Sequence, residues 1–135
     1  MALKWYTVVI DCEDPQAQAR WWAQALDWQV VFDTPDEAVA IPKGVTEDAV
    51  EDLDEWMARG QGLVFVPVPE GKTVKNRLHI DLAPHTSQDR DAEIQRLLDL
   101  GATKVDVGQD EDEVTWTVLA DPEGNEFCVL SSRDR

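Results

Sequence analysis

The sequence lacks a long apolar run, a cysteine framework and an excess of basic residues. No apolar stretch approaches the roughly 20 residues that a membrane-spanning helix needs, so we expect no membrane partner. Two cysteines, Cys12 and Cys128, are too few for a disulfide framework, and the N-terminus does not resemble a signal peptide. We therefore expect a reduced, cytoplasmic protein.

Basic residues are outnumbered, with 12 lysines and arginines against 28 acidic residues and a formal net charge of −16. A surface this acidic repels phosphate backbones and anionic lipids, which disfavours nucleic acid and membranes as partners. The chain has 135 residues, and its 43% hydrophobic content is ordinary for a folded protein with a substantial core. We expect one domain over residues 1–135.

The most informative stretch is residues 76–82, where polar and apolar side chains alternate with the period of a β-strand. The alternation places three ionisable side chains on one face: Arg77, His79 and Asp81. The opposite face is apolar and includes Leu78. A base, an imidazole and an acid on one strand face predict a chemical centre here.

Other local patterns predict further elements. Strands are expected at residues 5–11, 28–32, 37–41, 62–69, 103–107, 114–119 and 126–130, with an acidic turn at 108–113. Asp14 followed by Pro15 predicts a helix to about Leu26, because a carboxylate caps a helix and proline suits its first position. We expect Trp21 and Trp22 to pack in the core rather than form a ligand platform.

Two more helices are predicted. One starts near Thr86 and ends at Gly101 in a left-handed C-terminal cap. The other is a short amphipathic helix near residues 46–59, capped by Thr46, with an apolar stripe that includes Leu53, Trp56 and Met57. Its acidic residues are interpreted as a solvated face, and a lid or dimer contact is the alternative.

The order strand, helix, three strands occurs twice, with an offset of roughly 70 positions, which indicates a duplicated unit. Each half would place one helix on one face of its sheet. Two such sheets facing each other would enclose a cleft.

The chain resembles the vicinal oxygen chelate superfamily, which includes glyoxalase I, bleomycin-resistance proteins and extradiol dioxygenases. The resemblance covers nearly the whole chain and is carried by residues 9–15, 21–28, 78–82, 100–102 and 119–127, of which the Asp121-Pro122-Glu123-Gly124-Asn125 turn is the most specific. Within the superfamily the chain is most similar to small glyoxalase-like domains of actinobacterial type.

The resemblance implies an α+β fold of tandem βαβββ modules, the glyoxalase/bleomycin-resistance fold. Two mixed sheets would enclose a cleft with the helices outside. Module one would cover about residues 4–69 and module two about 75–131.

The superfamily's metal site takes one ligand from the first and last strand of each half. On this chain those positions fall on Thr7, near Phe65, on His79 and on Cys128. Only His79 is a good match, so a metal-free pocket is favoured and no cofactor is assigned. If a divalent metal binds, His79 with Glu126 or Cys128 would hold it. A rearranged site would draw on four side chains: His79, Asp81, Glu126 and Cys128.

The same topology would line the cleft with ligand-binding residues Thr7, Asp11, Arg77, Trp116, Glu126 and Cys128. His79 and Asp81 would be the catalytic pair, with Asp81 setting the tautomer of a general base. Arg77 would bind a carboxylate or phosphate, and Trp116 would stack on a planar ligand. The alternatives are that Arg77 is a surface cation, that His79 and Asp81 form a structural ion pair, and that Cys128 is a small buried hydrophobe.

Two functions follow. One is a module that binds a small organic ligand in the cleft without converting it. The other is a lyase or isomerase of glyoxalase type that uses His79, either with a metal or by acid–base chemistry. Exposed strand edges also predict a homodimer, and superfamily members commonly pair in this way.

Overall fold

A computed structural model describes residues 3–106 and 115–135, so the predicted acidic turn at residues 108–113 lies outside the described residues. The chain forms two compact units, Met1–Gly71 and Lys72–Arg135, and each is described by itself. Within the described ranges no helix has both the length and the apolar character needed to cross a membrane.

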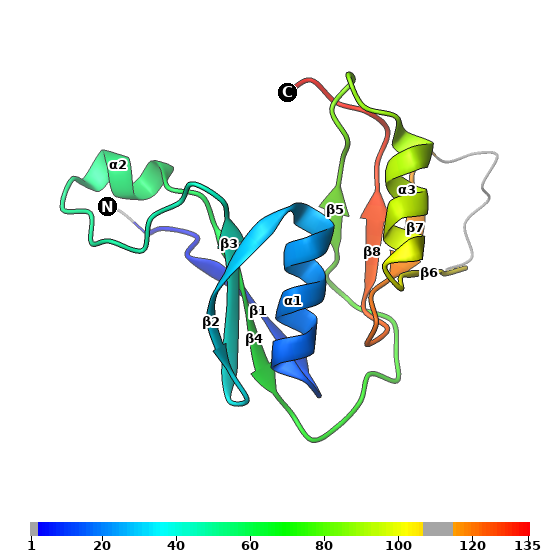
Figure 1. Cartoon of the computed structure of the whole chain (residues 1–135), viewed down its shortest axis with the longest axis horizontal. Coiled ribbons are helices and arrows are strands. Elements are labelled where there is room, and N and C mark those ends of the chain that lie inside the picture. Colours follow the sequence, from blue (N-terminus) through cyan, green and yellow to red (C-terminus); the bar gives the residue numbers. More distant parts are fainter. Residues whose placement is uncertain (1–2, 107–114) are drawn as a thin grey trace. The chain divides into compact units, whose positions relative to one another are not determined.

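The first unit is built on a four-stranded mixed sheet (Figure 1). Its strands are β1 (Thr7–Cys12), β2 (Trp28–Thr34), β3 (Glu37–Pro42) and β4 (Gly62–Pro67), in the order β1-β4-β3-β2. The β1–β4 pair is parallel, whereas β3 is antiparallel to both of its neighbours. β4 is therefore an inner strand, and Pro67 ends it rather than marking a sheet edge.

Helix α1 (Pro15–Leu26) has the bounds that the sequence predicts. Asp14 caps it by accepting a hydrogen bond from the Ala17 amide at 3.1 Å, and proline occupies the first turn, where its missing N–H is not needed. Trp21 and Trp22 are buried and pack edge to face with ring centroids 5.2 Å apart. Both tryptophans therefore belong to the core, as predicted.

The two faces of the first sheet differ. Alternate residues of β3 and β4 are fully buried on the face that α1 covers, such as Ala38 opposite Phe65. Their neighbours Val39 and Val64, also paired with each other, fall on the opposite face and are only partly buried. Thr7 shares that second face, because β1 pairs in register with β4. The first sheet thus has one packed face and one partly exposed apolar face.

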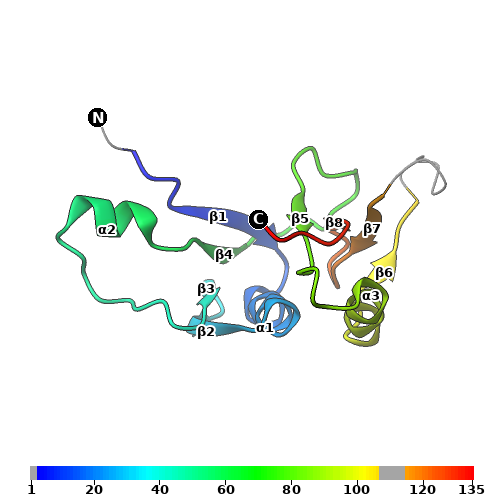
Figure 2. The same cartoon turned by 90° about the horizontal axis from the view of Figure 1, so that it is seen from above.

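The inserted helix is shorter than predicted. Helix α2 (Leu53–Ala58) begins after Asp52, which caps the Glu55 amide at 2.9 Å, whereas Thr46 instead bonds the nearby Asp48 amide. The predicted apolar stripe does not pack in the core, since α2 has no buried residue and Leu53 is 53% exposed. Figures 1 and 2 show the reason: α2 lies away from α1, beside the segment leading into β1, and not against a sheet face.

The second unit repeats the arrangement with shorter strands. They are β5 (Ile80–Leu82), β6 (Thr103–Lys104), β7 (Thr117–Ala120) and β8 (Glu126–Val129), in the order β5-β8-β7-β6. The β5–β8 pair is parallel and the other two pairs are antiparallel. The tandem βαβββ architecture with two mixed sheets is therefore confirmed.

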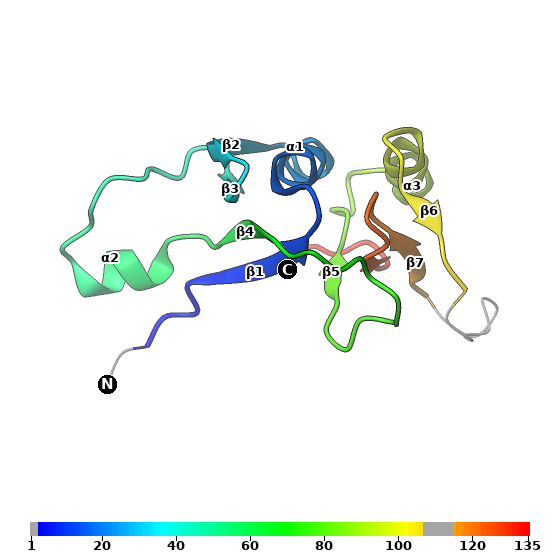
Figure 3. The same cartoon turned by 90° about the horizontal axis from the view of Figure 1, so that it is seen from below.

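Helix α3 (Arg90–Asp99) covers one face of this second sheet (Figure 3). Arg90 ties the helix to the sheet through the carbonyls of Val129 and Leu130 and the Thr117 hydroxyl, at 2.8, 2.9 and 3.0 Å. The helix starts later than predicted, because Asp89 rather than Thr86 caps it. Gly101 has a positive φ of 116°, as the left-handed C-terminal cap requires.

The strand predicted at residues 76–82 is mostly a loop, since only Ile80–Leu82 forms β5. Leu78, expected on the buried face, is 88% exposed. The partner strand β8 begins at Glu126, one residue before the partner of Ile80, so the residues before His79 lie beyond its start, and the Asn76 amide donates to the Glu126 carboxylate at 3.0 Å. The alternating pattern is present in the sequence, but its first half does not pair.

Candidate functional site

The predicted centre of the second unit forms a cluster of three side chains: His79, Asp81 and Cys128. Asp81 and Cys128 are cross-strand neighbours in the β5–β8 pair. The Asp81 carboxylate lies 2.8 Å from His79 Nδ1. One nitrogen, one oxygen and one sulfur atom from the three side chains all lie within 4.8 Å of one another. The structure therefore brings both predicted catalytic residues together with one predicted ligand-binding residue.

The cluster lies on the sheet face away from α3. Thr117 on β7 bonds to α3, and by alternation Cys128 and its partner Val118 point to the other side. His79 and Asp81 side chains are 46% and 44% exposed, whereas Cys128 is buried. A half-exposed imidazole can meet a ligand, while the buried thiol cannot do so without rearrangement.

Burial raises the pKa of the Cys128 thiol, and the Asp81 carboxylate raises it further through its negative charge and by accepting a hydrogen bond. A nucleophilic cysteine needs a lowered pKa, because the thiolate is the reactive form. Cys128 therefore does not have the properties of a nucleophile. Asp81 contacts both His79 and Cys128, so it fixes the orientation of the imidazole.

Glu126 lies on the same strand face as Cys128 but has other partners. Lys72 Nζ binds one carboxylate oxygen at 2.8 Å, and the Asn76 amide binds the other at 3.0 Å. Burial raises the pKa of Glu126, but the Lys72 hydrogen bond, the Asn76 amide and the Lys72 charge outweigh this, and the net pKa is lowered. A metal or substrate that binds Glu126, as predicted, would have to displace Lys72 or the Asn76 amide from its carboxylate.

The other predicted site residues do not join the cluster through any described contact. Arg77 is exposed in the loop before β5, and Trp116 is 40% exposed just before β7. Thr7 and Asp11 lie on β1 of the first unit, where the Thr7 hydroxyl donates to the Gly62 carbonyl at 3.0 Å. The alternation of β1 was enough to place both side chains on the face that α1 leaves uncovered.

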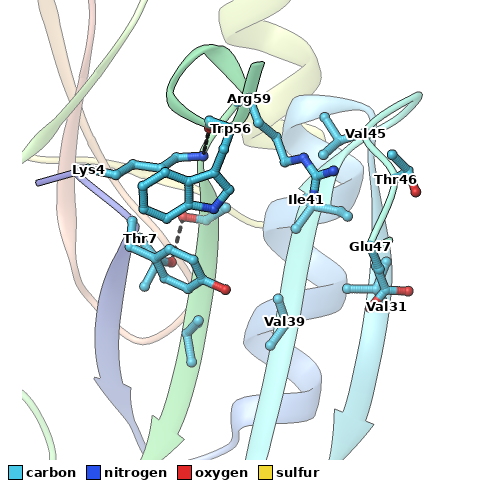
Figure 4. Close-up of a pocket in the computed structure, with 14 residues that line it drawn as sticks. Lys4, Thr7, Val31, Val39, Ile41, Val45, Thr46, Glu47, Trp56 and Arg59 are labelled. Carbon is cyan, nitrogen blue, oxygen red and sulfur yellow. Dashed lines mark hydrogen bonds between the residues drawn. The ribbon is translucent and has the colours of Figure 1, made fainter. Parts of the chain in front are cut away.

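A pocket of about 250 Å³ lies on that uncovered face of the first sheet (Figure 4). Its floor is formed by Thr7 and Gly62 together with Val31, Val39, Ile41 and Val64 from the sheet. Its rim is formed by Lys4, Tyr6, Val45, Thr46, Glu47, Trp56, Arg59 and Gly60. Of the predicted site residues only Thr7 lines this pocket.

Sequence reasoning missed the rim of the pocket. Lys4 binds the Trp56 carbonyl at 2.6 Å and its Nζ lies 5.1 Å from the centre of the Trp56 ring. This contact joins the N-terminal segment to α2 across 52 positions. The sequence did single out Trp56, as part of a helix whose alternative interpretation is a lid or dimer contact, but no local pattern connects it to Lys4.

A family model described as a glyoxalase-like domain matches residues 7–130 of the chain. Among functionally curated proteins, none matches it. Several solved structures share its fold. A glyoxalase/bleomycin resistance protein/dioxygenase family enzyme from Burkholderia phytofirmans is 16% identical, with a TM-score of 0.66 over 97% of this chain and 100% of that one.

Two further structures illustrate the range of this likeness. The fosfomycin resistance protein FosX from Listeria monocytogenes, an E126Q mutant complexed with Mn(II) and 1S,2S-dihydroxypropylphosphonic acid, is 10% identical, with a TM-score of 0.67 over 98% of this chain and 93% of that one. A possible glyoxalase from Bacillus cereus is 15% identical, with a TM-score of 0.62 over 96% and 99% of the two chains. At these identities the likeness concerns the fold.

Proposed function

The chain belongs to the glyoxalase-like domain family, and we propose that it binds a small organic ligand in the pocket of its first unit. The observation that carries this proposal is the hollow of about 250 Å³ on the sheet face that α1 does not cover. Ligand sites are concave and mostly apolar, with a few polar groups that fix orientation. This pocket has that character, with four aliphatic side chains on its floor and Trp56 at its rim.

Trp56 is the residue on which binding is expected to depend most. Its side chain lines the pocket, while the short helix that carries it buries no residue of its own. A large aromatic side chain kept at the edge of a hollow provides contact area for a planar ligand at little entropic cost. The inserted helix thus contributes Trp56 to the rim of the pocket.

Calorimetric titration with 2-naphthamide, a neutral planar probe, tests this proposal. We expect saturable binding that Trp56→Ala weakens at least tenfold, because most of the ring contact is removed. Trp5→Ala is the matched control, since Trp5 is 68% exposed in the same unit and does not line the pocket. Equal loss in both variants, or none in either, would contradict the proposed site.

A second candidate function is a lyase or isomerase of glyoxalase type that uses His79. The observation that favours it is the 2.8 Å contact between His79 and Asp81, which leaves Nε2 of a neutral imidazole as the basic nitrogen. In this reading Asp81 sets the tautomer and His79 removes a proton from the substrate. Arg77 and Trp116 would bind the substrate's charged and planar parts.

The cluster also fits a divalent metal. Its nitrogen, oxygen and sulfur donors lie within 4.8 Å of one another, and the donors of a tetrahedral zinc ion are about 3.5 Å apart, so the three side chains would have to move closer together to hold one ion. His79, Asp81 and Cys128 would hold the ion, and a bound ion would supply Lewis acidity. The Listeria neighbour contains Mn(II), which supports testing for a metal here.

Metal analysis of protein purified without chelators tests the metal-dependent form of the enzyme. A stoichiometric metal that His79→Ala abolishes would favour the enzyme. Cobalt(II) titration gives a second readout, because a thiolate ligand produces a charge-transfer band that Cys128→Ser would remove. A chain that holds no metal and takes up no cobalt would exclude the metal-dependent form of the enzyme and leave the ligand-binding module and the acid–base form of the enzyme.

We also propose that the protein forms a homodimer. Among the described residues each sheet ends in two edge strands, β1 and β2 in the first and β5 and β6 in the second, and such edges favour pairing with another copy. Light scattering coupled to size exclusion measures the mass directly. A mass equal to the 15.2 kDa chain at all concentrations tested would contradict the dimer.

A further inference from the structure

Two cations line the pocket of the first unit, and both are held by backbone carbonyls. Lys4 Nζ donates to the Trp56 carbonyl at 2.6 Å, and Arg59 Nη2 donates to the Asp48 carbonyl at 2.9 Å. In residues 3–106 and 115–135, the ion pairs of the structure involve other cations. A carbonyl orients a cation without cancelling its charge, so both positive charges remain available.

The charge of the pocket differs from that of the chain. The lining contains Lys4 and Arg59 but one acid, Glu47, whereas the whole chain has 28 acidic and 12 basic residues. Figure 4 shows Lys4 and Arg59 reaching the same end of the pocket as Trp56. The residues that line the pocket therefore carry a net positive charge, although the protein as a whole is strongly anionic.

Both cations keep donors for a ligand. Arg59 has five N–H groups and Lys4 has three, and the structure assigns one hydrogen bond to each side chain. Both residues are partly buried, and partial exclusion of water strengthens the attraction between a cation and an anionic group. An arginine can also bind a carboxylate or a phosphate through two parallel hydrogen bonds.

We propose that the ligand is an organic anion with an apolar, planar body, whose carboxylate or phosphate group is bound by Lys4 and Arg59. The body would lie against Trp56 and the aliphatic floor. This inference rests on the proposed function, because it names the class of ligand that the pocket takes. The net charge of −16 repels anions from the protein as a whole, so binding of an anion would depend on the local positive charge of these two cations.

The test compares three probes of similar shape by calorimetric titration of the full chain: 2-naphthoate, 2-naphthyl phosphate and neutral 2-naphthamide. We expect the better of the two anions to bind at least tenfold more tightly than the amide. Whichever anion binds better identifies the charged group. A variant with both Lys4→Met and Arg59→Met should lose at least tenfold in anion affinity and bind the amide within threefold of the wild type.

The control is a variant with both Arg20→Met and Lys43→Met. These cations belong to the same unit but pair with Asp33 and Asp27 outside the pocket, so their loss should leave the preference for the anion unchanged. Circular dichroism checks that each variant is folded.

The outcomes are distinct. If the amide binds as well as both anions, or if the Lys4 and Arg59 variant keeps the preference, the inference is overturned and the proposed function stands. If none of the three probes binds, the proposed function fails and the inference fails with it. If the control variant loses the preference as well, net charge rather than the two cations is responsible, and the inference is overturned.

Discussion

Asp81 is the residue that connects the cluster of the second unit. Its carboxylate lies 2.8 Å from His79 Nδ1 and accepts a hydrogen bond from the Cys128 thiol, and it is the half-exposed member of a β5–β8 pair. A carboxylate with two donors is held in one orientation, which in turn fixes the imidazole. The chemistry of this cluster therefore depends on Asp81 as much as on His79.

Asp81→Asn should lower the pKa of the Cys128 thiol. The substitution removes the negative charge that disfavours the thiolate, although burial still raises the pKa. The measurement is thiolate absorbance against pH in a Cys12→Ala background, so that one thiol is observed. Asp99→Asn, which removes an exposed acid of the same unit, should leave the titration unchanged. An unchanged titration in Asp81→Asn would mean that the thiol does not contact this carboxylate.

Glu126→Gln should destabilise the protein at neutral pH. Lys72 and Glu126 side chains are 19% and 11% exposed, and losing one partner of a largely buried pair costs about 1–3 kcal/mol. The folded-state pKa of Glu126 is lowered, so its contribution is complete above the usual value of 4.5 and is lost as the pH falls through the folded-state pKa. The difference between wild type and variant should therefore shrink in acid.

Urea unfolding at several pH values between 7 and 3 measures that difference. Glu93→Gln is the matched control, because Glu93 pairs with Arg96 on the exposed surface of α3 and should contribute less than about 1 kcal/mol. A difference that grows in acid would contradict the lowered pKa.

At the scale of elements, the two tryptophan-bearing helices of the first unit have opposite roles. Trp22 on α1 is 1% exposed and Trp56 on α2 is partly exposed beside a pocket. Trp22→Ala should cost about 3–5 kcal/mol of unfolding free energy, because it leaves a cavity under α1. Trp56→Ala should cost under about 1 kcal/mol and affect ligand binding instead. Denaturant unfolding of both variants measures the contrast, and equal losses would refute it.

The start of α1 depends on its cap. Asp14→Ala should destabilise the first unit by about 1 kcal/mol, because the Ala17 amide loses its acceptor. Denaturant unfolding measures the change. Glu51→Ala is the control, since Glu51 is an exposed acid outside any helix or strand. A cost in the control as large as in Asp14→Ala would assign the effect to charge rather than to capping.

At the scale of the whole molecule, charge repulsion opposes the compact state. A net charge of −16 on 135 residues should make thermal stability rise with salt at pH 7, because ions screen the repulsion. Each kcal/mol of relief corresponds to about 3–5 °C in Tm for a chain of this size. Calorimetry in sodium chloride measures the effect, which should fade near the isoelectric pH of about 4.2. A Tm that falls with salt at pH 7 would contradict this prediction.

The architecture could be predicted from local sequence because its signals are short-range. Asp14 and Pro15 set the start of α1, alternation placed Thr7 on the uncovered face of its sheet, and the order of elements predicted two βαβββ modules. The cluster of His79, Asp81 and Cys128 could also be anticipated, since His79 and Asp81 are two positions apart in an alternating pattern and the topology implied by the resemblance places Cys128 beside them. In each case the deciding neighbours lie within a few residues or in a regular ladder.

Only the tertiary structure decided the path of the loops and the residues that they contact. Lys72 reaches Glu126 across 54 positions, and the Asn76 amide binds the same carboxylate, in a segment that lies beyond the start of β8 and so is a loop rather than the predicted strand. Lys4 bonds Trp56 across 52 positions and completes a pocket that no sequence motif predicted. Hydrogen bonds of this kind depend on the path of irregular backbone, which composition and periodicity do not encode. The sequence by itself determined the two modules and their faces, and only the folded chain decided which side chains gather on them.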